Sequence, residues 1–308
     1  MYEETETQFI ETDTLRFEVD VCGDPTSQRL ALCLHGFPEH AYSWRYQLPL
    51  LAQLGYRVWA PNQRGYGRTM RPLGVASYTT DLLVDDVAAL IDAADCKEVT
   101  LIGHDWGGVI AWAFALGRVR PLERLIVMNL PHPAKFMQGP RISRQTLRSF
   151  YAIFFQLPRL PEMLLTARGA FVVGEAFRAM AVDKSRFPDD VLDFYRRHAL
   201  QPGVATAMLN WYRGLWRSRA FMRGLIEMPR IEIPSLMVWG EQDSALGVEL
   251  TYGTEEHVAD LTIRYLAHAS HWVQQDAPDD VNAILEAWLT EKPVPGAERS
   301  AEQTRIPS

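Results

Sequence analysis

Hydrophobic residues in the first 130 positions form short continuous runs that alternate with helical patterns. Residues 30–34 are apolar throughout and residues 99–102 are apolar except for Thr100, as is typical of strands buried on both faces of a sheet. Between such runs, residues 82–94 place apolar side chains at helical spacing. Because strands and helices alternate, the pattern predicts an α/β fold with a mostly parallel sheet flanked by helices.

The pattern changes at both ends and in the middle of the chain. Residues 9–21 alternate apolar and polar side chains around a polar break, which predicts a strand hairpin at a sheet edge. After residue 132 the pattern becomes helical, aromatic and arginine-rich, and an insert of this length predicts a lid over the sheet. Strands resume near 235, and a polar, proline-containing tail follows the last helix. We therefore expect a core of residues 1–132 and 230–293, a helical cap of residues 133–229, and a disordered tail of residues 294–308.

Residues 103–108 read Gly-His-Asp-Trp-Gly-Gly and connect a predicted strand to a predicted helix. Glycines allow a sharp turn there, so the residue at its tip points out of the sheet edge, close to the positive end of the helix. In the Gly-x-Ser-x-Gly nucleophile elbow this residue is serine, whereas here it is Asp105. Taken alone, Asp105 also fits the role of a helix N-cap.

A hydrolytic site also needs a base and an acid that orients it. These should follow the nucleophile in the order acid, then histidine, each just after a strand. Asp243 and His271 fit both requirements. Glu241 is the rival acid and His268 the rival base, but His268 lies closer to its strand. The ordered set makes a catalytic role for Asp105 more plausible than capping.

Residues 35–38, His-Gly-Phe-Pro, follow the strand at 30–34 in the place where such a fold forms an oxyanion hole. The backbone N–H groups of Phe37 and Trp106 are the two candidate donors. We expect the bond before Pro38 to be cis, which would fix the turn. A simple tight turn remains the alternative for this loop.

An aspartate nucleophile favours a different chemistry from a serine. A carboxylate is ionised at neutral pH and can attack a saturated carbon without a base, forming an ester with the substrate. His271 would then activate a water molecule that hydrolyses the ester at Asp105. Asp105 therefore favours epoxides or alkyl halides over ordinary esters and amides.

The chain resembles the epoxide hydrolases of the α/β-hydrolase superfamily, in the branch with an aspartate nucleophile. The resemblance lies in residues 103–108, in His-Gly-Phe-Pro-Glu at 35–39 and in residues 271–278, and it extends from about residue 10 to 290. It implies the α/β-hydrolase fold with an inserted cap, and two cap tyrosines that protonate the opened epoxide oxygen. Residues 149–156 and 209–213 resemble the segments that carry them, at Tyr151 and Tyr212. Each tyrosine also fits a packing role.

Haloalkane dehalogenases share the Asp-Trp elbow, so a dehalogenase is the alternative function. They need N–H donors for the halide, and Phe37 has no side-chain donor where one is wanted. Fluoroacetate-type dehalogenases resemble the loop at 35–38 but carry arginine at the position of Trp106. The preferred function is hydrolysis of a small apolar epoxide to a diol. We expect the substrate to contact Phe37, Trp106, Phe155 and Trp211.

Net charge, hydrophobic runs and cysteine content limit the partners and the cellular location that we expect. The 308 residues carry a net charge of −7, with no run of Lys and Arg that indicates nucleic acid or a membrane surface. No apolar run is long enough to span a bilayer, and the acidic start is unlike a signal peptide. The three cysteines are scattered. We expect a cytoplasmic enzyme, monomeric or homodimeric, without metal, cofactor, nucleic-acid partner or membrane partner.

Overall fold

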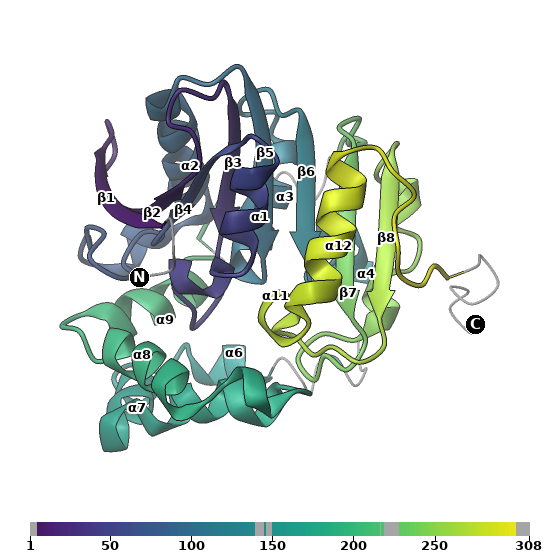
Figure 1. Cartoon of the computed structure of the whole chain (residues 1–308). Helices are drawn as coiled ribbons and strands as arrows, with labels where there is room; N and C mark the ends of the chain where they lie inside the picture. Colours follow the sequence, from purple (N-terminus) through teal and green to yellow (C-terminus); the bar gives the residue numbers. More distant parts are fainter. Residues whose placement is uncertain (1–4, 139–144, 146–149, 216, 219–227, 300–308) are drawn as a thin grey trace.

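The computed structural model describes residues 5–138, 145, 150–215, 217–218 and 228–299 (Figure 1). One sheet of eight strands has the order β1-β2-β4-β3-β5-β6-β7-β8. β2 is antiparallel to β1 and β4, and the other neighbouring pairs are parallel. The predicted edge hairpin and the mostly parallel sheet are thus confirmed. The strands are β1 Glu6–Glu11, β2 Arg16–Cys22, β3 Arg29–Leu34, β4 Arg57–Pro61, β5 Glu98–His104, β6 Arg124–Met128, β7 Ser235–Gly240 and β8 Leu261–Leu266.

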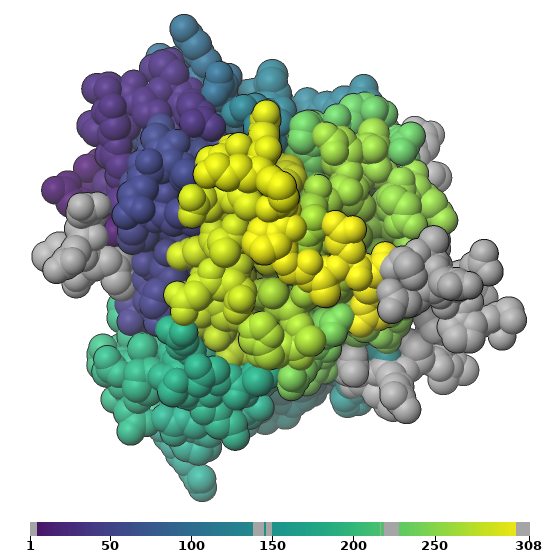
Figure 2. All heavy atoms as spheres, turned by 45° about the vertical axis from the view of Figure 1, so that its right-hand side comes forward, coloured from purple at the N-terminus to yellow at the C-terminus, as the bar shows by residue number. Residues whose placement is uncertain are grey.

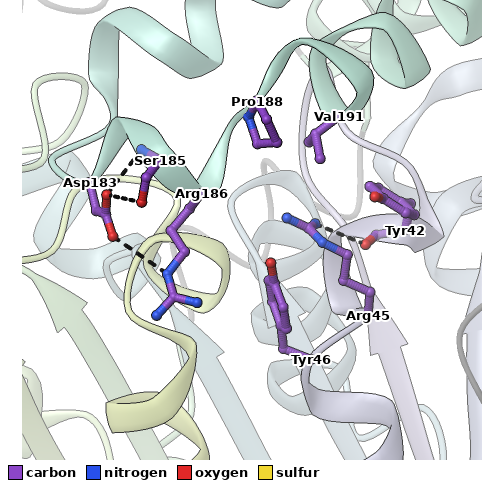
Figure 3. A pocket seen from close by; sticks show the side chains of 8 residues that line it. All are labelled: Tyr42, Arg45, Tyr46, Asp183, Ser185, Arg186, Pro188 and Val191. Carbon is purple, nitrogen blue, oxygen red and sulfur yellow. Dashed lines mark hydrogen bonds and ion pairs between the residues drawn. The ribbon is translucent and has the colours of Figure 1, made fainter.

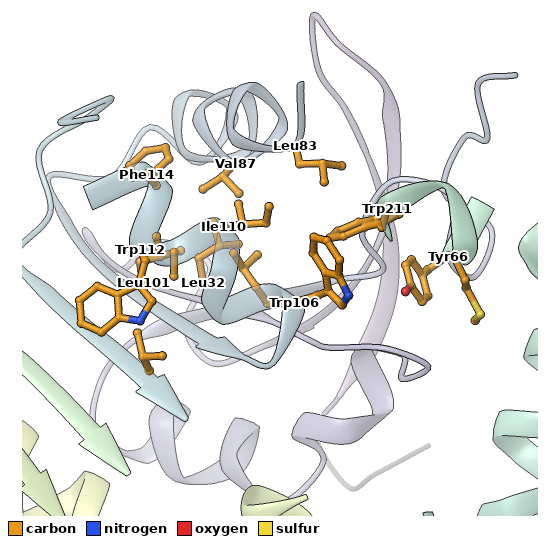
Figure 4. Close-up of a cluster of buried hydrophobic side chains, with 14 of the residues drawn as sticks. Leu32, Tyr66, Leu83, Val87, Leu101, Trp106, Ile110, Trp112, Phe114 and Trp211 are labelled. Carbon is orange, nitrogen blue, oxygen red and sulfur yellow. The ribbon is translucent and has the colours of Figure 1, made fainter. Parts of the chain in front are cut away.

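Helices cover both faces of the sheet because successive strand residues point to opposite sides. In β3, Leu30, Leu32 and Leu34 join one apolar cluster, and Ala31 and Cys33 join the other. The first cluster includes α2 and α3 (Figure 4), and the second includes α1 and α12. These helices are α1 Gln47–Gln53, α2 Thr80–Ala94, α3 Trp106–Leu116 and α12 Pro278–Leu289, with short α11 Val273–Asp276 before the last.

The helical insert lies at the carboxyl ends of the parallel strands, where the arrowheads of β6 and β8 point in Figure 1. It forms the lower lobe in Figure 2. Its helices share the first apolar cluster with the sheet, so insert and core pack as one unit. α7 is interrupted by non-helical backbone from Ala167 to Ala170. We use "cap" for residues 133–229, which contain α4 Pro133–Gln138, α6 Phe150–Phe154, α7 Leu160–Met180, α8 Asp189–Ala199 and α9 Val204–Leu215.

The end of the chain differs from the expected disordered tail. Residues 294–299 pack against the sheet, where Tyr265 N donates to Ala297 O at 3.0 Å and Arg299 Nε to Glu241 at 3.0 Å. These contacts are with residues distant in sequence, so local composition did not indicate them. Residues 300–308 lie outside the described residues. Among the described helices, none is long and apolar enough to cross a membrane.

Candidate active site

Asp105 occupies a sharp turn between β5 and α3. Its backbone has φ 48° and ψ −119°, and its side chain makes no capping hydrogen bond to the helix. The turn depends on glycine, since a Cβ at Gly107 would lie 2.1 Å from Leu34 O and one at Gly103 would lie 2.4 Å from Gly107 O. The predicted elbow is therefore confirmed, and capping does not explain Asp105.

Asp105, His271 and Asp243 come together as an ordered hydrogen-bonded set. Nδ1 of His271 lies 2.7 Å from Oδ2 of Asp243, and its Nε2 lies 3.5 Å from Oδ2 of Asp105. The rival residues lie elsewhere, His268 in an exposed pair with Asp280 and Glu241 in contact with Arg299. The geometry thus separates the candidates that sequence left open.

The two carboxylates and the imidazole of this set shift one another's pKa values. Burial alone would lower the pKa of His271, but the carboxylates of Asp243 and Asp105 raise it well above its usual value. Burial alone would raise the pKa of Asp105, yet the hydrogen bond and charge of His271 lower it. Both shifts favour an ionised Asp105 beside a protonated His271.

The loop after β3 presents a backbone donor to Asp105. Phe37 N donates to Asp105 Oδ1 at 2.8 Å, and the Phe37–Pro38 bond is cis as expected. A Cβ at Gly36 would lie 2.5 Å from the Cβ of Asp105, so only glycine permits this approach. Trp106 is the first residue of α3, where amide N–H groups have no partner within a helix. Its role as the second donor stays a prediction.

Tyr151 of α6 and Tyr212 of α9 lie beside one another near Asp105. Their ring centroids are 5.9 Å apart. Burial, then Tyr151 and the charge of Asp105, raise the pKa of Tyr212. Part of the Tyr151 side chain reaches the surface, yet lost hydration and the charge of Asp105 also raise the pKa of its phenol. Both phenols therefore keep their protons at neutral pH.

Three of the four expected substrate-contacting residues surround Tyr212. Its ring centroid is 5.1 Å from that of Phe37, 5.0 Å from that of Phe155 and 4.9 Å from that of Trp106. Trp211 differs, since its Nε1 donates to Arg64 O and its ring lies behind Trp106, beside Tyr66 (Figure 4). Contact between Trp211 and a substrate stays a prediction.

A buried carboxylate, Glu39, connects the loops of the site. Its Oε2 accepts from Gly36 N at 2.6 Å and contacts Nδ1 of His104 at 2.8 Å. Nε2 of His104 in turn lies 2.8 Å from the backbone oxygen of His271. Glu39 Oε1 accepts from Gln274 and Gln275. A role for Glu39 did not follow from the sequence, although its place directly after His-Gly-Phe-Pro is a signal.

Two further residues position the catalytic loops. Asn129 Nδ2 donates to Asp243 Oδ2 at 2.8 Å, and Asn129 Oδ1 accepts from Gly240 N. Asp276 accepts from Ser270 N, next to His271, and from the backbone of Val182 and Asp183 in the cap. The end of β6 could have drawn attention to Asn129, whereas nothing local indicates what Asp276 contacts.

A cavity of about 580 Å³ opens at the junction of core and cap (Figure 3). It contains none of the candidate catalytic residues. The buried Arg45 guanidinium borders it and donates to Gln275 Oε1 at 2.6 Å. The described residues include no cluster of three or more His, Cys, Asp and Glu suited to a metal ion. The cavity is lined by Tyr42, Arg45, Tyr46, Asp183, Ser185, Arg186, Pro188 and Val191.

Comparisons with known proteins agree with this architecture. The profile of the alpha/beta hydrolase fold family matches residues 32–278. YfhM, an AB hydrolase superfamily protein of Bacillus subtilis, is 37% identical over 284 residues, which cover 92% of this chain and 97% of that protein. Human epoxide hydrolase 4 is 35% identical over 289 residues, 92% of this chain and 78% of that protein.

A solved structure of an epoxide hydrolase also has this fold. The crystal structure of Bacillus megaterium epoxide hydrolase in complex with an inhibitor has a TM-score of 0.83 at 29% identity, covering 92% of this chain and all of that one. Fold, elbow and family match define an α/β hydrolase. Within that superfamily, the chain belongs to the epoxide hydrolases.

Proposed function

We propose that the enzyme converts an epoxide and water into a vicinal diol through an ester on Asp105. The observation that carries this proposal is the placement of two cap phenols beside the nucleophile: Tyr151 and Tyr212 lie together, and Tyr212 contacts Phe37 and Trp106, the two residues that flank Asp105. A strained ring placed between Asp105 and the phenols meets a nucleophile on one side and proton donors on the other. Relatives named epoxide hydrolases support the same reaction.

In the first step, Asp105 Oδ2 attacks a ring carbon. Oδ1 accepts from Phe37 N at 2.8 Å, whereas Oδ2 lies at the longer distance of 3.5 Å from His271 Nε2 and is therefore the atom we assign to the attack. The new C–O bond forms as the ring C–O bond breaks, and the released oxygen takes a proton from Tyr151 or Tyr212. A phenol suits this step because it stays neutral at pH 7 yet donates a strong hydrogen bond.

In the second step, water hydrolyses the ester. Because the ester is neutral, His271 first gives the proton that it carries at rest to the tyrosine anion left by the first step. His271 then takes a proton from water, and the resulting hydroxide attacks the carbonyl carbon of Asp105. The developing oxyanion receives the N–H of Phe37, with that of Trp106 as the second donor. On collapse the expelled diol oxygen takes the proton of the attacking hydroxyl, so the diol leaves, Asp105 is again a carboxylate and His271 again carries a proton. Asp243 orients His271 throughout.

Diol formation from epoxides, compared with halide release from alkyl halides, distinguishes this function from dehalogenation. The double variant Tyr151→Phe with Tyr212→Phe loses the proton donors but keeps Asp105, His271 and both rings. We expect epoxide turnover to fall by at least about 100-fold, measured as diol formed from a panel of aryl and alkyl epoxides.

A control and an opposite result accompany this test. Tyr252→Phe removes a phenol elsewhere in the core and should leave diol formation unchanged. Halide release by the wild-type enzyme, without diol from any epoxide, would instead favour the dehalogenase. Full epoxide turnover by the double variant would show that Tyr151 and Tyr212 are not the required proton donors.

A further inference from the structure

The outer side of α6 and of the first turn of α7 exposes large apolar side chains. Spacings of three and four residues place members of each segment on a common side. Their exposed fractions range from 43% to 67%, although water is an unfavourable environment for such groups. We call this surface the apolar cap face, formed by Phe150, Ile153, Leu157, Leu160, Met163 and Leu164.

Exposed apolar side chains are unevenly distributed over the described part of the chain. Of fifteen large hydrophobic residues that are exposed, thirteen belong to the cap, and only Met70 and Leu73 lie outside it. Single exposed apolar residues are ordinary on protein surfaces, whereas a gathered set marks an interaction site. The cap, which forms the lower lobe in Figure 2, therefore presents a surface suited to a partner.

Charge is distributed just as unevenly. The cap carries 15 Lys and Arg against 7 Asp and Glu, a net charge of +8 within a chain of net charge −7. Close to the apolar cap face along the chain, next to Leu160 and four residues after Leu164, Arg159 and Arg168 are exposed and form no ion pair among the described residues. The carboxylate in this segment, Glu162, is paired with Arg213 at 2.6 Å. The apolar cap face is thus bordered by uncompensated positive charge.

We propose that the apolar cap face docks on the surface of an anionic lipid bilayer. Its six apolar side chains enter the interface, while Arg159 and Arg168 contact the headgroups. The charge argues against a second copy of the chain on this face, since two caps of charge +8 repel each other. The sequence predicted no membrane partner because it contains no continuous run of Lys and Arg. The basic residues of the cap are instead spread along its length.

Docking places the membrane close to the site. Tyr151 lies on α6 between Phe150 and Ile153, and its phenol is within the field of Asp105. A lipophilic epoxide concentrated in the bilayer would therefore have a short path to the nucleophile. This delivery step rests on the proposed function, but docking itself does not.

Co-sedimentation with vesicles tests docking by itself. We use phosphatidylcholine vesicles with and without phosphatidylglycerol, and the full-length protein. We expect binding to the anionic vesicles only, weakening as salt rises. Arg159→Glu with Arg168→Glu, and separately Ile153→Gln with Met163→Gln, should each weaken binding about tenfold or more.

Matched variants outside the cap control for charge and hydrophobicity. Lys97→Glu with Arg118→Glu makes the same charge change, and Met70→Gln with Leu73→Gln makes the same polar substitution at exposed sites. Both should bind anionic vesicles like the wild type, with all variants unfolding at wild-type temperature.

Three results would overturn the proposal. The first is equal binding to neutral and anionic vesicles, or none to either. The second is loss of binding in the control variants but not in the cap variants. The third is a lipid-free dimer, seen by light scattering, that Ile153→Gln with Met163→Gln converts to monomer. Because the assay reads binding alone, it stands or fails independently of epoxide turnover.

Discussion

Asp105 and His271 set each other's charge in the resting enzyme. The carboxylate of Asp105 helps raise the pKa of His271, and His271 lowers the pKa of Asp105. In the proposed mechanism, esterification of Asp105 removes its negative charge. The pKa of His271 must then fall, so the residue that was protonated before attack becomes able to accept a proton from water. The first chemical step thus prepares the base for the second.

The variant Asp105→Asn mimics the neutral ester. We expect the pKa of His271 to be lower than in the wild type, because Asp243 alone remains to favour the imidazolium. Nitrogen NMR of the imidazole across a pH titration measures the shift. Asp280→Asn, a change of an exposed carboxylate paired with His268, should leave the His271 titration unchanged. An unchanged or raised pKa in Asp105→Asn would break the proposed link between the two steps.

For individual site residues, their position relative to the predicted strands was a better guide than local composition. Asp243 and His271 could be chosen because each follows a strand whose end meets the same rim. Glu39, Asn129 and Asp276 were not assigned because their roles consist of hydrogen bonds to residues far away in sequence. Trp211 was expected at the substrate because aromatic residues line pockets and cores alike.

The β5–α3 elbow requires glycine at a particular point. A Cβ on Gly107 would meet the backbone oxygen of Leu34, the last residue of buried strand β3, and that of His35, which follows it. Backbone at this buried strand end cannot move aside. Gly107→Ala should therefore lower the free energy of unfolding by about 2–4 kcal/mol. Urea unfolding of the variant measures the change.

A glycine at the other end of α3 provides the control. Gly117 has an ordinary helical φ, and an added Cβ there meets the movable side chain of Val119. Gly117→Ala should change stability by no more than about 1 kcal/mol in either direction. Equal effects of the two substitutions would show that the close approach at the elbow carries no special cost.

The same element illustrates what a pattern can predict. A strand, a glycine-rich turn and a helix were visible in residues 99–116 because each depends on neighbouring residues. The strands near 235 and 261 and the closing helix were visible for the same reason. Residues 294–299 were not, because their order comes from contact with β8 and Glu241.

Cap and core are joined through the loop that carries His271. The carboxylate of Asp276 accepts three backbone N–H groups, two from the cap and one from Ser270. Gln275 makes a second connection, since its Oε1 accepts from Tyr195 of α8. Displacement of the cap would therefore disturb the loop that carries His271.

Asp276→Ala removes this connection. We expect the free energy of unfolding to fall by about 2–4 kcal/mol, since the buried N–H of Ser270 and the part-buried N–H groups of Val182 and Asp183 lose a charged acceptor. Hydrogen exchange at Val182, Asp183 and Ser270 should accelerate together. Asp279→Ala, at an exposed carboxylate paired with Arg186, is the control and should leave these amides protected. Protection that survives in Asp276→Ala would contradict the coupling of cap and catalytic loop.

The whole-molecule arrangement was predictable only in part. The length of the insert and its helical pattern indicated a cap over the carboxyl ends of the strands. They could not indicate which cap residues face the site and which face outward, because α6 carries apolar residues on both sides. Tyr151 and Ile153 are two positions apart, yet only Tyr151 is coupled to Asp105.

The ester on Asp105 is the central claim, and mass spectrometry of His271→Gln tests it most directly. This variant keeps the nucleophile but cannot activate water. After incubation with an epoxide that the wild type hydrolyses, it should gain the mass of one substrate molecule, located on the peptide containing Asp105. Asp105→Asn in the same background should gain none. An unmodified His271→Gln protein that still forms diol, or an adduct on another residue, would contradict the account.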